Sequence, residues 1–185
     1  MKSGSIVYRG KTKSGKDLLI RYLSKEDIPE LLKLMNKISL EKTFILFQGE
    51  QLTLKEETKY VQEKLKKIKK NKLVKLLAFV NNQLAGVSDI ELKNKVVSHQ
   101  GSFGIIIDKN FRGDGVGGIL MDNVIKEAKE KFKSLKIIDF DVFGDNIIAQ
   151  NLYKKMGFKK YGLLPKGIKH RDKFVDQILM YKEIR

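Results

Sequence analysis

The chain has 185 residues, of which 42% are hydrophobic, and a formal net charge of +16. This length suits one domain with a substantial core, and this hydrophobic content argues against intrinsic disorder. The sequence contains no cysteine, which excludes disulfides, thiol catalysis and cysteine-ligated metal. No apolar run approaches the roughly 20 residues that span a bilayer, and the N-terminus lacks an apolar signal region. We therefore expect a cytoplasmic protein without a membrane partner.

The positive charge has two interpretations. It could mark a nucleic-acid-binding protein, or it could belong to a lysine-rich solvated surface. The densest run, residues 64–72, lies on the polar side of a predicted helix whose apolar positions include Val61 and Ile68. Specific nucleic-acid recognition would add exposed aromatic or arginine residues, which are not evident. A solvated face is favoured, and nucleic-acid binding is kept as an alternative.

The N-terminal half of the chain predicts one strand and two helices. Residues 1–16 are short, polar and glycine-containing, and form either a polar leader or an extra edge strand. Residues 17–22 alternate as a strand does, and residues 24–38 carry an apolar face at helical spacing. The motif Thr53-x-x-Glu56 is a capping box, and it predicts a second helix that runs to about residue 70.

The C-terminal half predicts a meander of strands followed by alternating elements. Strands are expected at residues 73–80, 83–93, 96–107, 136–142, 158–164 and 174–182. A glycine-rich loop and an amphipathic helix follow the third of these strands, a short helix covers residues 147–156, and residues 165–173 form a loop. There is no repeat and no low-complexity linker, so residues 17–185 are expected to form a single domain.

The most informative segment is the glycine-rich loop that begins at Arg112. Four glycines occupy six positions, Gly113, Gly115, Gly117 and Gly118, and the helix begins among them at Val116. Glycine lets a ligand approach the backbone closely, and the free N–H groups of a helix start attract anions. Arginine adds a forked charge that suits phosphate. The loop therefore predicts a pyrophosphate-binding site.

The same loop admits a dinucleotide-binding interpretation. Gly113-x-Gly115-x-x-Gly118 formally matches the dinucleotide fingerprint, and Asp139 and Asp141 lie about 20–30 residues further on. In that fingerprint, however, the first glycine directly follows the strand, whereas here residues 108–112 intervene. A dinucleotide-binding oxidoreductase is therefore kept as an alternative to the competing pattern, Arg-x-x-Gly-x-Gly.

The competing pattern, together with a second block, resembles the GNAT superfamily of acetyl-CoA-dependent N-acetyltransferases. The first block is Arg112-x-x-Gly115-x-Gly117. The second is Asn146-x-x-Ala149-x-x-Leu152-Tyr153-x-x-x-Gly157-Phe158, which is similar to the signature that follows the family's fifth strand. The two blocks occur in the family's order and spacing, and the close similarity covers roughly residues 100–162.

The resemblance implies an α/β fold with a mixed, mostly antiparallel central sheet of six to seven strands flanked by helices. The fourth and fifth strands would splay apart to admit the pantetheine arm of acetyl-CoA. Residues 17–185 would form one N-acetyltransferase domain. This domain would transfer acetyl to a primary amine of a protein, peptide or small molecule, by direct attack in a ternary complex and without a metal. Dimers are frequent among relatives, so a homodimer is open by analogy.

The resemblance also implies site residues. Tyr153 would be the general acid that protonates the leaving thiolate. The base is open, because relatives carry it where this chain has Gly101 and Phe103; His99, Asp89 and Glu91 are the candidates. The residues expected to bind the cofactor are Ile105, Ile106, Ile107, Arg112, Gly113, Asp114, Gly115, Val116, Gly117, Gly118, Asn146 and Tyr153.

Overall fold

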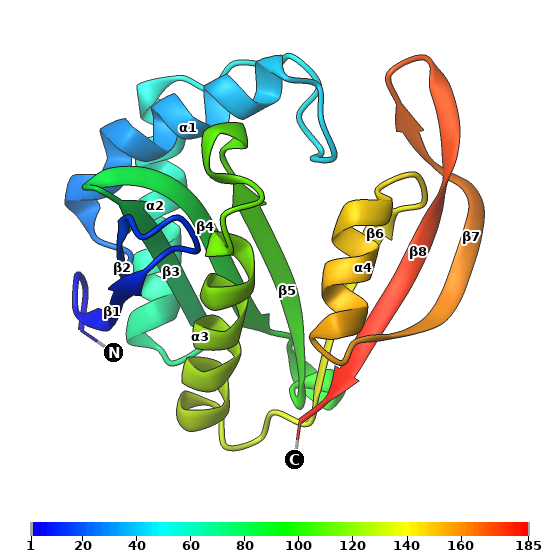
Figure 1. Cartoon of the computed structure of the whole chain (residues 1–185). Coiled ribbons are helices and arrows are strands. Elements are labelled where there is room, and N and C mark those ends of the chain that lie inside the picture. Colours follow the sequence, from blue (N-terminus) through cyan, green and yellow to red (C-terminus); the bar gives the residue numbers. More distant parts are fainter. Residues whose placement is uncertain (1, 185) are drawn as a thin grey trace.

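The computed structural model describes residues 2–184 and contains an eight-stranded sheet. The strand order is β1-β2-β3-β4-β5-β6-β8-β7, and every neighbouring pair is antiparallel except β5 and β6 (Figure 1). The strands are β1 (Ile6–Lys11), β2 (Asp17–Tyr22), β3 (Leu73–Val80), β4 (Gln83–Leu92), β5 (Gln100–Ile107), β6 (Ile137–Phe143), β7 (Lys159–His170) and β8 (Lys173–Glu183). The predicted mixed, mostly antiparallel sheet is confirmed.

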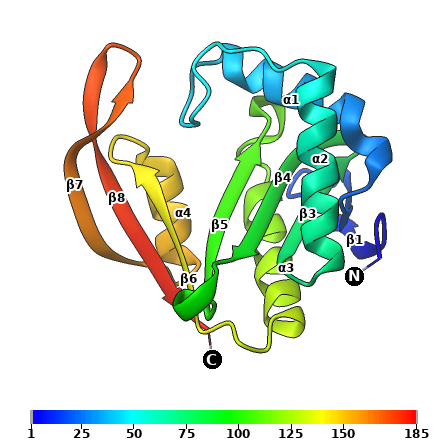
Figure 2. The ribbon, with the colours of Figure 1, turned by 180° about the vertical axis from the view of Figure 1, so that it is seen from behind.

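Helices cover both faces of the sheet. Figures 1 and 2 show α1 and α2 on one face and α3 on the other. All eight residues of β3 are buried, because this central strand is covered from both sides. The helices are α1 (Ile28–Leu40), α2 (Leu54–Lys69), α3 (Val116–Lys131) and α4 (Ile147–Lys155). No helix within residues 2–184 combines the length and the apolar character that crossing a membrane requires.

Local sequence signals explain where the helices begin. Thr53 and Glu56 form the predicted capping box: the Thr53 hydroxyl accepts from the Glu56 N–H, and the Glu56 carboxylate accepts from the Thr53 N–H. Helix α3 starts directly after Gly115, whose φ of 84° is left-handed and suits glycine. The β3–β4 hairpin turns at Asn81 and Asn82, both with positive φ, as expected for a two-residue turn.

The sheet has eight strands, whereas six to seven were expected. Residues 6–11 form the edge strand β1, which pairs antiparallel with β2. The turn after β1 continues the contact, since the Lys13 N–H donates to the Asp114 carbonyl in the glycine loop. The polar, glycine-containing composition of this segment does not reveal that contact, because its partner lies about 100 residues away in the sequence.

Two predicted boundaries were wrong. Residues 165–173 were expected to be a loop, but β7 continues to His170 and the hairpin turns at residues 171–172. The register shift between Leu164 and Ile168 accommodates Pro165 and Gly167, which signalled a loop. Residues 95–97 form a short 3-10 helix, so β5 begins at Gln100 rather than at residue 96.

Close packing of β4 against β5 yields a stability prediction. A Cβ at Gly86 would lie 2.6 Å from the Ile106 carbonyl oxygen, and backbone atoms cannot move away cheaply. We expect Gly86→Ala to lower the free energy of unfolding by about 1–3 kcal/mol, measured by urea denaturation. Gly118→Ala is the matched control, because a Cβ there meets nothing within 4 Å and alanine favours helix. Equal losses in both variants would contradict this account of the β4–β5 contact.

Candidate active site at the divergence of two strands

Strands β5 and β6 pair over only three residues and then diverge. We call the space between the unpaired parts of these two strands the gap. Gln100, Gly101 and Ser102 pair with residues 137–139, and no β6 partner follows for residues 103–107. Figure 2 shows the two strands close at one end and apart at the other. This confirms the expected splay of the fourth and fifth strands, which are β5 and β6 here.

An aromatic cluster connects the diverging strands. We use this name for Phe103 of β5, Phe140 of β6, Tyr153 of α4, and Phe158. The ring centroids of Phe103 and Phe140 are 5.1 Å apart, and those of Phe140 and Tyr153 are 4.6 Å apart, both edge-to-face. Such pairs contribute about 0.5–1.5 kcal/mol beyond their buried area. Side-chain packing therefore replaces backbone hydrogen bonds where the strands separate.

The open edge of β5 presents backbone groups to the gap. The Gly104 carbonyl accepts from the Ser88 hydroxyl of β4 at 2.8 Å, so the polar groups of Gly104 point toward β4. Because these groups alternate along a strand, those of Ile106 also point toward β4, and those of Ile105 and Ile107 point into the gap. Arg112 Nε donates to the Ile107 carbonyl at 2.8 Å. The N–H groups of Ile105 and Ile107 thus face the gap.

The glycine loop fits a phosphate group. Gly113 and Gly115 have φ values of 81° and 84°, and no side chain caps the start of α3. The first N–H groups of a helix have no intrahelical partner, so those of residues 116–118 are available to an anion. No protein atom lies within 4 Å of a Cβ placed on Gly118, so packing does not require glycine there. A short 3-10 helix, Lys109–Phe111, separates the loop from β5, unlike in the dinucleotide fingerprint.

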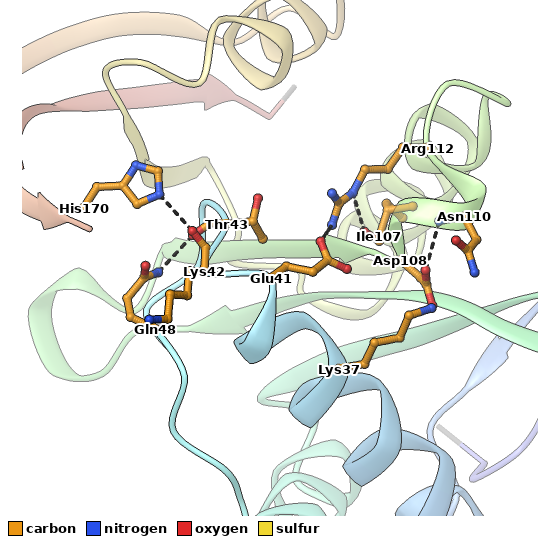
Figure 3. Close-up of polar contacts among 10 residues, drawn as sticks. All are labelled: Lys37, Glu41, Lys42, Thr43, Gln48, Ile107, Asp108, Asn110, Arg112 and His170. Carbon is orange, nitrogen blue, oxygen red and sulfur yellow. Dashed lines mark hydrogen bonds and ion pairs between the residues drawn. The ribbon is translucent and has the colours of Figure 1, made fainter. Parts of the chain in front are cut away.

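Arg112 and Asp114 hold the loop in place through protein contacts. Arg112 pairs with Glu41, at the end of α1, at 2.9 Å (Figure 3). The Asp114 carboxylate accepts from the Ser14 N–H at 2.7 Å and from the Ser14 hydroxyl at 2.6 Å. The hydroxyl bond from Ser14 is the main reason that the pKa of Asp114 is lowered. Both side chains predicted to bind the cofactor therefore also connect the loop to distant segments.

Helix α4 places the second block beside the gap. The Asn146 side chain caps α4 by accepting from the Ala149 N–H at 3.2 Å. Tyr153 is 8% exposed within the aromatic cluster, and burial raises its pKa to about 12. The phenol therefore keeps its proton at neutral pH, as a general acid must.

The loop between α1 and α2 contacts the β7–β8 hairpin on the other half of the sheet. His170 Nε2, in the β7–β8 hairpin, lies 3.2 Å from the Lys42 carbonyl oxygen of this loop (Figure 3). The Phe44 ring lies 5.0 Å from that of His170 and 5.7 Å from that of Phe143. These contacts join the two halves of the sheet where β5 and β6 do not pair.

A cavity of about 310 Å³ lies on the α1–α2 face of the sheet. We call it the α1–α2 cavity. Gly104, Ile105 and Ile106 form part of its wall, so the cavity and the gap share one strand. Its remaining lining residues are Leu31, Met35, Phe47, Leu52, Glu56, Glu57, Tyr60, Lys75, Val87, Ser88 and Asp89.

The charged side chains that line the cavity differ in whether they have a partner. Lys75 Nζ donates to Asp89 at 2.6 Å and to the Tyr60 hydroxyl at 3.1 Å. Burial lowers the pKa of Lys75, but the charge of Asp89 and these hydrogen bonds raise it by a larger amount, so the net shift is upward. Glu57 is 2% exposed, and its Oε1 has no hydrogen-bond partner among the described residues. Burial raises the pKa of Glu57, opposed by the charge of Lys75.

The three predicted bases occupy different places. Asp89 lines the α1–α2 cavity. Glu91 lies further along β4, and its carboxylate pairs with Lys64 at 2.8 Å and with Lys67. His99 precedes β5 at the end where the strands pair, and its carbonyl accepts from the Lys136 N–H. Asp89 lies opposite Gly104, in the part of β5 that has no β6 partner, whereas Glu91 lies opposite Ser102, the last residue that still pairs with β6.

Sequence reasoning missed Glu57. It lies four residues before the buried Val61, which places it on the buried face of α2. A carboxylate on the buried face of an amphipathic helix was the available signal. This signal is weak, because α2 carries many charged residues and the sequence alone does not show which of them packs against the sheet.

Comparison with known proteins identifies the family. A family model described as the Acetyltransferase (GNAT) family matches residues 39–158. The chain therefore belongs to the GNAT acetyltransferase family. Among curated proteins it is similar to L-amino acid N-acetyltransferase AaaT of Escherichia coli (strain K12), with 30% identity over 106 residues. That match covers 57% of this chain and 65% of the relative, so it spans just under two thirds of the curated relative's length.

Solved structures agree with the family assignment. The structure of a GNAT-family acetyltransferase from Streptococcus pneumoniae has a TM-score of 0.82 and 31% identity, covering 91% of this chain and 99% of that one. The structure of yncA from Salmonella typhimurium with acetyl-CoA, described as a putative acetyltransferase, has a TM-score of 0.78 and 14% identity, covering 91% and 94%. This second likeness supports the fold.

The unpartnered carboxylate predicts a stability change that depends on pH. A carboxyl whose pKa is raised in the folded protein contributes stability below its unfolded pKa and loses it as the pH rises through the folded pKa. We therefore expect Glu57→Gln to raise the free energy of unfolding at pH 7 more than at pH 4, measured by urea denaturation at both. The control is Glu63→Gln, an exposed residue of the same helix. A loss of stability in Glu57→Gln at pH 7 would contradict this assignment of the charge.

Proposed function

We propose that this protein transfers an acetyl group from acetyl-CoA to a primary amine by direct attack in a ternary complex. The observation that carries the proposal is the shared strand: Gly104–Ile106 borders both the gap between β5 and β6 and the α1–α2 cavity. An acyl donor in the gap and an amine in the cavity would meet at this strand. AaaT of E. coli is by its name an amino-acid N-acetyltransferase, which supports an amine acceptor.

The binding of acetyl-CoA is proposed from backbone groups. The N–H groups of residues 116–118 would hold the pyrophosphate at the start of α3. The N–H groups of Ile105 and Ile107 would bind the pantetheine arm or the developing oxyanion, as preorganised donors. In this arrangement Arg112 acts through its contacts with Ile107 and Glu41, which fix the loop.

Tyr153 is proposed as the acid for the leaving group. When the amine attacks the carbonyl carbon, the carbon–sulfur bond breaks and the thiolate needs a proton. The phenol of Tyr153 is protonated at neutral pH and lies in the cluster that spans the diverging strands. No metal takes part in this mechanism.

Ligand binding tests the donor half of the proposal. We expect CoA at 100 times its Kd to stabilise the protein by about 2.7 kcal/mol, seen as a rise in Tm. NAD⁺ is the control, because the alternative oxidoreductase would respond to NAD⁺ and not to CoA. Stabilisation by NAD⁺ alone would contradict the proposal. A nucleic-acid-binding protein would instead show affinity for DNA or RNA that falls steeply with salt.

Substitution of Tyr153 tests the mechanism. We expect Tyr153→Phe to lower kcat about 100-fold or more, since a general acid contributes 10²–10⁴-fold. The Kd for CoA should remain within about twofold of the unmodified protein. Tyr161→Phe, on the exposed side of β7, is the matched control and should retain activity. Unchanged kcat in Tyr153→Phe would remove this residue from the mechanism.

A further inference from the structure

We infer that Glu57 is the carboxylate that binds the ammonium group of the acceptor, and that the acceptor is a small primary amine with an apolar body and no carboxylate beside the nitrogen. This inference rests on the proposed function, because it assigns the acceptor to the α1–α2 cavity. It concerns Glu57 of α2, which lines the same cavity as the shared strand.

The first step in the argument is the unusual state of Glu57. A fully buried carboxylate is normally paired, since burying an ionised group without a partner is costly. Glu57 is 2% exposed, and its Oε1 lacks any hydrogen-bond partner within residues 2–184. It also lines a cavity large enough for a small organic molecule. A cationic ligand would supply the partner that the protein does not.

The second step is the charge of the neighbours. Lys75, from β3, is the cation among the lining residues. It is 3% exposed and already donates to Asp89 and Tyr60. From β4, Asp89 is therefore neutralised by Lys75. On α2 itself, Glu56 caps Thr53 at the helix start. The lining residues from α1 carry no charge, so the cavity has an excess of negative charge that favours a cation.

The third step is the wall of the cavity. The side chains of Leu31, Met35, Phe47, Leu52 and Val87 make most of it apolar. Such walls favour an alkyl or aromatic body. A free amino acid would bring a carboxylate, and the lining offers it no cation that is not already paired. The cavity therefore selects an amine whose neighbouring group is neutral.

The assignment also supplies a proton acceptor. An acceptor amine arrives as R–NH₃⁺, and one N–H bond breaks as Glu57 takes the proton and the nitrogen regains its lone pair. Attack on the acetyl carbonyl forms the C–N bond and breaks the C–S bond. The thiolate takes its proton from Tyr153, and the nitrogen then loses a second proton, which restores the Tyr153 phenol. The net reaction releases one proton, through Glu57, to solvent.

Three ligands with one body test the inference directly by calorimetry, without turnover. Phenethylamine carries the ammonium, 2-phenylethanol replaces it with a neutral hydroxyl, and phenylalanine adds a carboxylate. We expect the protein to bind phenethylamine about 10–100-fold more tightly than 2-phenylethanol, and at least tenfold more tightly than phenylalanine. In Glu57→Gln the preference for amine over alcohol should disappear, while Glu63→Gln should keep it.

The outcomes separate this inference from the proposed function. If CoA binds but phenethylamine shows no preference over the alcohol, the Glu57 assignment is wrong and acetyl transfer stands. If phenylalanine binds best, the acceptor is an amino acid and the inference is overturned. If the amine preference depends on Glu57 but CoA does not bind, the acetyltransferase proposal fails and the amine site stands. Restoration of the preference by Glu57→Asp would support a role for the charge rather than for the shape of the side chain.

Discussion

The loss of backbone pairing between β5 and β6 after Ser102 is the feature on which the rest of the site depends. Unpaired strand edges are costly in a folded protein, and native structures usually cover them. Here the aromatic cluster joins the strands on one side, and the contact of His170 with the Lys42 carbonyl joins the halves of the sheet at the open end. The open edge of β5 is therefore held in place by side chains, and its N–H groups remain available to a ligand.

A second constraint fixes the position of the glycine loop, which contacts the turn between β1 and β2. Asp114 connects the loop to Ser14, and Arg112 connects it to Glu41 at the end of α1. Both contacts cross long stretches of sequence, so they fix the loop relative to the sheet and to the helix that borders the cavity. Charged side chains in this loop thus fix the backbone that we propose as the pyrophosphate site, and part of the family motif is explained by these protein contacts alone.

The sequence predicted the elements whose signals are local. The glycine pattern located the start of α3, the Thr53–Glu56 box located α2, and the two family blocks predicted the splay. The features it left open or missed depend on distant partners. For residues 1–16 an extra edge strand was one of two alternatives, and only the pairing with β2 decides between them. The longer β7–β8 hairpin needs a bulge, and the isolation of Glu57 becomes visible only when α2 packs on the sheet.

The central claim is that acetyl-CoA binds along the open edge of β5 and at the start of α3. Amide hydrogen exchange, resolved by residue with and without CoA, tests it most directly. The account predicts slower exchange on CoA addition at Ile105, Ile107 and residues 116–118, and little change at Ile106, whose amide already points toward β4. Protection confined to other segments, with exchange at Ile105, Ile107 and the start of α3 unchanged, would contradict the account.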